Sequence, residues 1–273
     1  MIKVADALRE AAAALAPTSP TPRLDAELLM AHSMGVTRSH LLLQGQGGTP
    51  PELFSEILER RKRSEPVAYI VGHQEFYGRE FRVTRDTLIP RADSETLIAA
   101  ALGERPEAKR VLDLGTGTGA LLLTFVAETG ASGVGLDRSA AAIDVAVENT
   151  ARLGMDNRVT LTTGDWHQPG WAKNLGQFDV ILCNPPYVEL GARLESDVSD
   201  YEPAIALFAG EDGLDDYRIL IPELRNLLLP DGIIVLEIGH QQDQSVAQIA
   251  QGSGFVTELF RDLAHRPRAL LLK

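Results

Sequence analysis

Beyond about residue 93 the chain alternates short apolar strands with helices, and this alternation restricts it to a small group of folds. We predict strands at residues 110–114, 133–137, 158–163, 179–183 and 232–238, with two more near the C-terminus, and helices at residues 94–102, 120–129, 140–153, 214–228 and 244–251. Parallel strands need crossover connections, which are usually helices that cover the faces of the sheet. The pattern therefore predicts an α/β fold with a doubly wound, mostly parallel sheet.

The first part of the chain has helical periodicity instead. Helices are predicted there at residues 4–15, 24–34, 38–44 and 52–63. Two short alternating stretches flank Gly78, a pattern that is typical of a β-hairpin. We therefore expect a small all-helical domain at residues 1–64, a β-hairpin linker at residues 65–90 and the α/β domain at residues 91–273.

A glycine loop follows the strand at residues 110–114. It consists of Gly115, Thr116, Gly117, Thr118 and Gly119. Glycines let the backbone turn sharply and let a cofactor approach the main chain closely. The next strand ends at Asp137, whose carboxylate can accept hydrogen bonds from both hydroxyls of a ribose. We predict a cofactor that contains a nucleoside. The loop also satisfies the dinucleotide fingerprint, so a nicotinamide cofactor stays open at this point.

An Asp–Trp pair follows the third predicted strand, at the same expected edge of the sheet. Asp165 can accept a hydrogen bond from the amino group of an adenine, and the Trp166 indole can stack on the base. The alternative is that Trp166 covers the core. His167, beside the pair, is interpreted as a surface residue rather than as a catalyst.

The tetrapeptide Asn184-Pro185-Pro186-Tyr187 follows the strand at residues 179–183, where open α/β sheets bind their ligands. The Asn184 side-chain oxygen and the Pro185 carbonyl can accept the two N–H bonds of a substrate amide, and Tyr187 offers a flat face. Proline makes the backbone rigid there and has no competing N–H. An amide nitrogen is a poor nucleophile, so orienting it is the main requirement, and orientation can contribute about 7–11 kcal/mol. The tetrapeptide suits methyl transfer to a planar nitrogen and has no use in hydride transfer.

Composition narrows the choice of partner and compartment. The formal net charge of −12 disfavours duplex nucleic acid, and the basic run at residues 60–63 is interpreted as the solvated end of a helix. Cys183 is the only cysteine, which fits a reducing cytoplasm, and we interpret it as an inert strand residue. The six histidines lack metal-ligand spacing, so no metal is expected. Without a recognisable signal or membrane-spanning run, we expect a cytoplasmic protein.

With these motifs located, the chain closely resembles the release-factor glutamine methyltransferases. The resemblance covers most of residues 66–273, although Ala92 and Ser94 stand where the family pattern has Pro and Thr. The further segments that carry it are residues 66–72, 75–78, 88–91, 202–203, 206–207, 210–214, 237–239 and 261–262. The resemblance implies a seven-stranded methyltransferase sheet and transfer of a methyl group from S-adenosylmethionine, which leaves S-adenosylhomocysteine. The implied acceptor is N5 of the glutamine in the Gly-Gly-Gln loop of peptide-chain release factors.

The resemblance also implies roles for particular residues. The helical domain would help hold the release factor. The donor site would be lined by the glycine loop at residues 115–119, Asp137, Asp165, Trp166 and Asn184, and the tetrapeptide at residues 184–187 would carry catalysis. Two other functions stay open. An amino methyltransferase for adenine or guanine in nucleic acid would use the same tetrapeptide, and a noncatalytic cofactor-binding adaptor would have no need of Asn184.

Overall fold

The computed structural model of this chain describes residues 2–45 and 47–273, which form two compact units. The helical unit comprises the chain up to His73 together with Leu194–Tyr201. The larger unit comprises Gln74–Arg193 and Glu202–Lys273. Part of the long polar loop after residue 187 therefore belongs to the helical unit, although no local sequence pattern indicated this.

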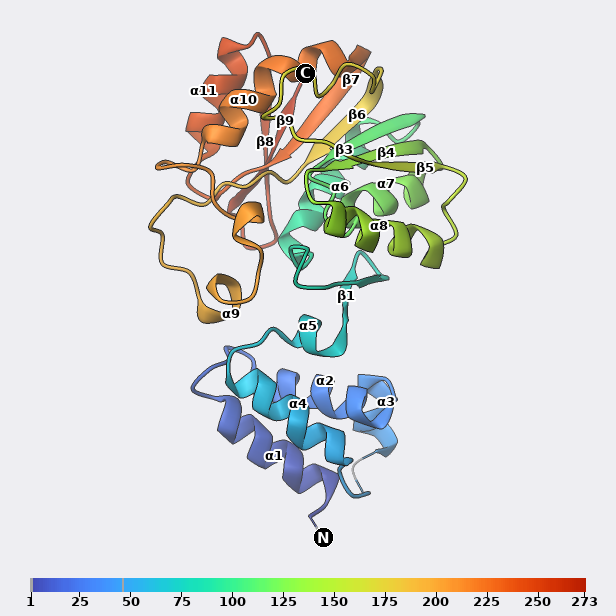
Figure 1. The fold of residues 1–273 in the computed structure, drawn as a ribbon, viewed down its shortest axis with the longest axis vertical. Coiled ribbons are helices and arrows are strands. Elements are labelled where there is room, and N and C mark those ends of the chain that lie inside the picture. Colours follow the sequence, from blue (N-terminus) through green and yellow to red (C-terminus); the bar gives the residue numbers. More distant parts are fainter. Residues whose placement is uncertain (1, 46) are drawn as a thin grey trace. The chain divides into compact units, whose positions relative to one another are not determined.

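The larger unit is built on a seven-stranded sheet (Figure 1). Its strands are β3 (Arg110–Leu114), β4 (Ser132–Asp137), β5 (Val159–Thr163), β6 (Phe178–Cys183), β7 (Leu228–Glu237), β8 (Thr257–Arg261) and β9 (Pro267–Leu272). They lie in the order β5-β4-β3-β6-β7-β9-β8. Neighbours from β5 to β7 are parallel, and β9 is antiparallel to both β7 and β8. The structure confirms the doubly wound, mostly parallel sheet.

Helices cover both faces of this sheet (Figure 1). They are α6 (Glu95–Glu104), α7 (Ala120–Thr129), α8 (Ala140–Arg152), α10 (Asp215–Leu224) and α11 (Asp243–Gly252), with short 3-10 turns η1 (Ala92–Ser94), η2 (Ala204–Ala206) and η3 (Arg225–Leu227). Strand side chains alternate between the faces. Val111 of β3 joins the core that contains α6 and α7, whereas Leu112 joins the core that contains α10 and α11. Among the described residues, no helix is both long and apolar enough to cross a bilayer.

The strand order reverses at β3. The chain continues from β3 to its neighbour β4 on one side, whereas β6 lies on the other side of β3. Loops that leave the carboxyl ends of β3 and β6 therefore diverge, and such a point in an open α/β sheet is where ligands bind. The glycine loop follows β3 and the tetrapeptide follows β6, so the topology places both predicted motifs at one crevice.

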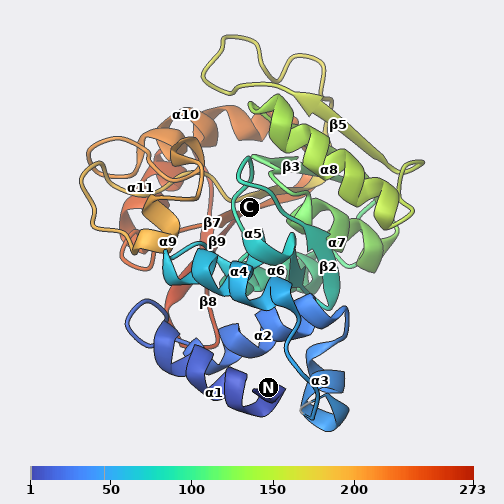
Figure 2. The ribbon, with the colours of Figure 1, turned by 60° about the horizontal axis from the view of Figure 1, so that its bottom comes forward.

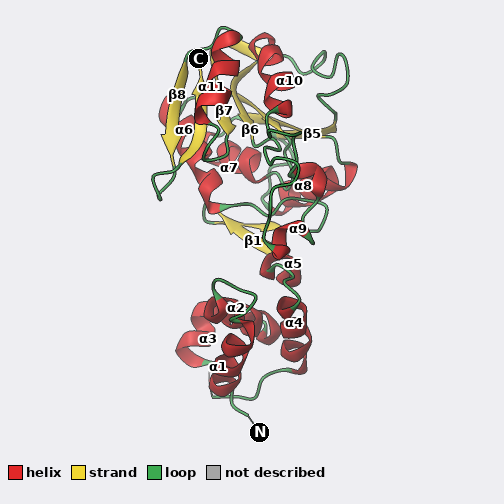
Figure 3. Cartoon of the chain, turned by 90° about the vertical axis from the view of Figure 1, so that its left-hand side faces the viewer, coloured by secondary structure: helices red, strands yellow, loops and turns green. Residues whose placement is uncertain are grey.

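The helical unit is a cluster of short helices packed against one another (Figures 2 and 3). Its elements are α1 (Val4–Leu15), α2 (Pro22–Met34), α3 (Arg38–Gln44), α4 (Glu52–Lys62), α5 (Val67–Val71) and α9 (Ser196–Ser199). The four helices predicted before residue 64 are confirmed, and α2 ends at Gly35 in the left-handed conformation. The helix α5 was not predicted; it lies in the segment expected to be a linker. Tyr201 holds the α9 segment in this unit, because its hydroxyl donates to the Arg63 carbonyl at 2.8 Å.

The basic run at residues 60–63 is structural. Arg61 is buried, and its Nε donates to the Asp25 carboxylate at 2.7 Å. Arg60 pairs with Glu65, and Lys62 pairs with Glu59. The interpretation of this run as a solvated helix end is therefore wrong for Arg61, because a carboxylate on α2 draws that guanidinium into the core of the unit.

The predicted β-hairpin is confirmed. Its strands are β1 (His73–Phe76) and β2 (Arg79–Arg82). Tyr77 and Gly78 between them have φ of 52° and 72°. Two consecutive residues with positive φ are typical of the tight hairpin turn whose twist matches that of the flanking strands.

Candidate functional site: a cavity at the carboxyl edge of the sheet

The glycine loop turns sharply between β3 and α7. Gly115, Gly117 and Gly119 have φ of 72°, 52° and 81°, values that residues with a Cβ rarely adopt. The backbone N–H groups of Gly115 and Thr116 both donate to the Leu136 carbonyl, at 2.8 and 3.0 Å, which ties the loop to β4. Because the glycines carry no side chains, the backbone of the loop is open to close approach by a ligand.

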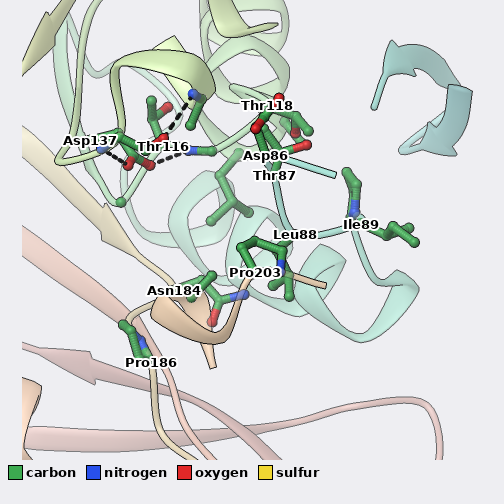
Figure 4. A pocket seen from close by; sticks show the side chains of 18 of the residues that line it. Asp86, Thr87, Leu88, Ile89, Thr116, Thr118, Asp137, Asn184, Pro186 and Pro203 are labelled. Carbon is green, nitrogen blue, oxygen red and sulfur yellow. Dashed lines mark hydrogen bonds between the residues drawn. The ribbon is translucent and has the colours of Figure 1, made fainter. Parts of the chain in front are cut away.

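Asp137, the last residue of β4, is oriented by the same loop. Its carboxylate accepts from the backbone N–H groups of Gly117 and Ser139, each at 2.9 Å (Figure 4). Burial raises the pKa of Asp137, and these hydrogen bonds act in the opposite direction. A carboxylate has about four lone-pair sites, so Asp137 can still accept from the two hydroxyls of a ribose.

A second carboxylate, Asp113, is buried beneath the loop in β3. Its Oδ2 accepts from the Thr116 hydroxyl at 2.7 Å, whereas its Oδ1 has no hydrogen-bond partner in the part of the chain that the structure describes. Burial raises the pKa of Asp113 to about 7, and the charge of Asp137 adds to the effect. Asp113 is therefore largely protonated below neutral pH.

We expect the stability of the protein without its ligands to fall as the pH rises from about 4 to about 7. In this range the folded state keeps the Asp113 proton, whereas the unfolded chain, with an ordinary pKa of 3.8, has lost it. The folded state binds more protons, so raising the pH favours unfolding. Urea denaturation at a series of pH values, on wild type and Asp113→Asn, would measure this. The decline should be smaller in the variant, and an equal decline in both proteins would contradict the prediction.

Trp166 packs against the glycine loop. A Cβ placed on Gly115 would lie 3.3 Å from the indole Cη2 atom. The indole is buried, and its N–H donates to the carboxylate of Asp216, a buried residue of α10, at 2.6 Å. Asp165 faces elsewhere: its Oδ1 accepts from the His167 backbone N–H and lies 3.0 Å from the His167 Nδ1 atom. Asp216 thus holds the ring of Trp166, a role that no sequence motif indicated.

We expect Asp216→Ala to weaken binding of the nucleoside-bearing cofactor by about tenfold. A hydrogen bond to a charged group contributes about 1.5–3 kcal/mol, and this one also orients the indole. Calorimetric titration with the cofactor would measure the change. Asp216→Asn is the matched control, because its amide oxygen can still accept from the indole N–H, and it should bind the cofactor far more tightly than Asp216→Ala. Equal, wild-type affinity in both variants would show that Asp216 does not act through Trp166.

The tetrapeptide leaves the sheet directly after β6. Pro185 and Pro186 are buried, whereas Asn184 and Tyr187 are half-buried. Cys183, just before it, is fully buried, and burial raises the pKa of its thiol well above the ordinary value. The thiol is therefore protonated at neutral pH, in agreement with its interpretation as an inert strand residue.

A cavity opens between the glycine loop and the tetrapeptide, with about 870 Å³ of space that includes its mouth. The cavity brings together most of the predicted site residues, namely Gly115, Thr116, Gly117, Thr118, Asp137, Trp166, Asn184 and Pro186. In Figure 4, Asn184 and Pro186 lie across the cavity from Asp137 and Thr116. The predicted residues that do not line it are Gly119, Asp165, Pro185 and Tyr187.

The rest of the cavity wall comes from residues to which the sequence analysis assigned no part in ligand binding. Residues 86–91, Pro203, Ile205 and Ala206 contribute to it, as does Arg138. Arg91 pairs with the buried carboxylate of Glu202, and Arg138 donates to the Ile205 carbonyl at 2.7 Å. Residues 88–91, Pro203 and Ala206 belong to segments that resembled the family pattern, whereas residues 86–87, Ile205 and Arg138 had no such signal.

The geometry fits a nucleoside-bearing methyl donor. Asp137 offers acceptors to a ribose, the Trp166 indole offers a flat wall to a base, and the glycine loop allows close approach of the donor. Asn184 lines the same cavity from the opposite side. The fold and this site define an S-adenosylmethionine-dependent methyltransferase.

Comparison with known proteins identifies the family of methyltransferases to which the chain belongs. Residues 6–72 match the PrmC N-terminal domain, and residues 106–263 match a methyltransferase domain. The chain is 42% identical to the release factor glutamine methyltransferase of Cereibacter sphaeroides, over 98% of this chain and 97% of the relative. It is 38% identical to the enzyme of the same name from Rhodospirillum rubrum, over 92% and 79%. The chain belongs to the release factor glutamine methyltransferase family.

A solved structure shares the fold at lower identity. The methyltransferase from Pyrococcus furiosus aligns with 72% of this chain and 89% of its own, with a TM-score of 0.54 and 17% identity. The sheet order and the alternating helices are therefore those of a known methyltransferase fold. The nicotinamide alternative that the glycine loop left open is not favoured.

Proposed function

We propose that this enzyme methylates N5 of the glutamine side chain in the Gly-Gly-Gln loop of peptide-chain release factors. The observation that carries the proposal is the position of Asn184, which lines the cavity opposite Asp137 at the carboxyl edge of the sheet. The relatives named for this activity match over nearly the whole chain. A nucleic-acid substrate loses support, because Arg60, Arg61 and Lys62 of the basic run are engaged in ion pairs within the helical unit.

Within this proposal, the donor is held by the glycine loop at residues 115–119 and by Asp137, Trp166 and Asn184, whereas Asp165, expected from the sequence to contribute, faces His167. The bound sulfonium supplies an electrophilic methyl group. The Asn184 side-chain oxygen and the Pro185 carbonyl accept the two N–H bonds of the glutamine amide. Pro186 lines the cavity beside Asn184, and Tyr187 supports the tetrapeptide from outside the cavity. Both acceptors interact more strongly as positive charge builds on the nitrogen, so they favour the transition state over the ground state.

The proton balance needs no strong base. The new N–C bond forms as the methyl carbon leaves sulfur, and the nitrogen, now positively charged, is acidic and releases one of its protons to water. Asn184 and the Pro185 carbonyl hold the amide while this happens. Orientation, rather than proton abstraction, is the enzyme's main contribution.

The proposal extends to the partner and the compartment. The helical region at residues 1–64 holds the release factor, and the methyltransferase region at residues 91–273 carries the chemistry. A cytoplasmic location fits both the partner and the single, buried and protonated cysteine, Cys183.

One mixed assay tests the function. The enzyme is incubated with labelled donor and with release factor, DNA and RNA together, and the release factor is then digested for mass spectrometry. We expect one added methyl group on the glutamine of the Gly-Gly-Gln peptide. A release factor whose glutamine is replaced by glutamate is the control and should take up no label. Label found only in nucleic acid would refute the proposal.

A further inference from the structure

Tyr187, the last residue of the tetrapeptide, is held by hydrogen bonds to residues outside the tetrapeptide. The Tyr187 hydroxyl donates to Oε1 of Glu237 at 3.2 Å, and the Tyr187 carbonyl accepts from Nε2 of Gln242 at 3.0 Å. Glu237 is the last residue of β7, which pairs with β6 up to the contact between Leu236 and Cys183. The neighbouring strand and the turn after it therefore hold both the side chain and the backbone of Tyr187.

The surroundings of Glu237 orient its carboxylate to accept the hydrogen bond from the Tyr187 hydroxyl. Its side chain is buried, and its second oxygen accepts from the hydroxyl of Ser94, which lines the cavity. Burial raises the pKa of Glu237, while the Ser94 hydrogen bond and the positive charge of Arg268 act against that rise. Arg268 is itself oriented by Asp93 at 2.9 Å. A buried carboxylate with such support is a strong and well-oriented acceptor.

Gln242 is equally constrained. Its Nε2 donates to the Gly213 carbonyl at 3.3 Å as well as to Tyr187, and its Oε1 accepts from the Gly239 backbone N–H at 3.0 Å. The backbone of Gly213 approaches so closely that a Cβ there would lie 2.4 Å from the Tyr187 carbonyl oxygen. Two segments that resembled the family pattern but had no assigned role, around Gly213 and Gly239, therefore meet at this contact.

We propose that Glu237 and Gln242 are positioning residues that hold Tyr187 at two points and thereby aim Asn184 and the Pro185 carbonyl at the substrate amide. The inference rests on the proposed function and deepens it. A turn that leaves a strand has conformational freedom, and a displacement of about 1 Å at reacting groups can cost about a hundredfold in rate. Two anchors on Tyr187 remove that freedom, although Tyr187 does not itself line the cavity.

A double-mutant cycle tests the side-chain anchor. Tyr187→Phe, Glu237→Ala and the double variant are assayed with release factor and S-adenosylmethionine. We expect each single variant to lower kcat by about tenfold and the double variant to lower it no further, because both changes weaken one contact. KM for the donor should stay within about twofold, since the cofactor side of the cavity is unchanged. Losses that multiply in the double variant would overturn the proposal.

Tyr217→Phe is the matched control. The Tyr217 hydroxyl donates to the backbone carbonyl of Glu237 at 2.7 Å, so this variant loses a buried hydrogen bond to the same residue while the side-chain contact with Tyr187 stays. It should lower the melting temperature and leave kcat unchanged. An equal loss of kcat in Tyr217→Phe and Glu237→Ala would mean that Glu237 matters only for stability.

Hydrogen exchange tests the backbone anchor without any substrate. We expect amide exchange in residues 184–190 to be faster in Gln242→Ala than in wild type, and to be unchanged in Tyr217→Phe. Unchanged exchange in Gln242→Ala would refute the anchor. This readout separates the two proposals: a wild-type enzyme that does not methylate release factor refutes the proposed function, whereas the exchange rates judge the positioning role in either case.

Discussion

Asn184→Ala should lower kcat/KM for methylation of release factor by about 10²–10³-fold, the loss that follows removal of one preorganised hydrogen-bonding group that stabilises a transition state. Alanine has no acceptor for the substrate N–H, so the amide can rotate away from the methyl group. Binding of the donor should be mostly retained, because the glycine loop, Asp137 and Trp166 are unchanged. Single-turnover kinetics would measure the chemical step, and calorimetry would measure donor affinity.

The same substitution at Asn226 is the control for this experiment. Asn226 is exposed in η3 and does not line the cavity, so Asn226→Ala should keep the wild-type rate. An Asn184→Ala enzyme with a rate within about threefold of wild type would mean that the amide acceptor supplies little of the transition-state stabilisation. The mechanism proposed for the tetrapeptide would then be wrong.

Arg61→Ala should destabilise the helical unit by about 3–5 kcal/mol, the cost of leaving one partner of a buried ion pair without its counter-charge. The Asp25 carboxylate that Arg61 contacts at 2.7 Å is buried, and it also accepts from the hydroxyls of Ser19 and Thr21 at 2.8 and 3.0 Å. These hydroxyls supply hydrogen bonds but no positive charge. Hydrogen exchange of amides in α2 and α4 would report the lost stability.

Arg63 offers the matched control for this change. It lies in the same basic run but is exposed, and Tyr201 uses its backbone carbonyl rather than its side chain. Arg63→Ala should therefore change stability by less than about 0.5 kcal/mol. Both tryptophans, Trp166 and Trp171, belong to the larger unit, so their fluorescence monitors that unit separately. Equal losses in the two variants would show that the buried pair has no special role.

Helices and strands that are specified by a short, contiguous stretch of sequence could be predicted well. The strand at residues 110–114 and the helix at residues 120–129 have the predicted bounds, because an apolar run, a glycine loop and a helical stripe are all contiguous in sequence. The strand predicted from Gly232 begins earlier, at Leu228, although Pro230 and Asp231 disfavour strand locally. Pairing of Phe178 with Leu228 extends that strand, and such pairing depends on a distant part of the chain.

The residues of the candidate site likewise divide into those that the local sequence could locate and those that it could not. Asp137 and Asn184 could be located because Asp137 ends one strand and Asn184 directly follows another, and the carboxyl ends of parallel strands share one edge. Asp165 stood out for the same reason, yet its carboxylate faces His167 and does not line the cavity. A position after a strand indicates the edge of the sheet but not the direction of the side chain.

The sequence by itself determined the class of sheet and the positions of the glycine loop and the tetrapeptide after their strands, because strands, helices and glycine loops have patterns within short stretches. Only the tertiary structure decided which distant side chains meet. It buried Arg61 against Asp25, closed the cavity with Pro203, Ile205 and Ala206, and brought Glu237 to Tyr187. Such contacts join elements far apart in the chain, and their distances depend on how helices and strands pack, which no local pattern records.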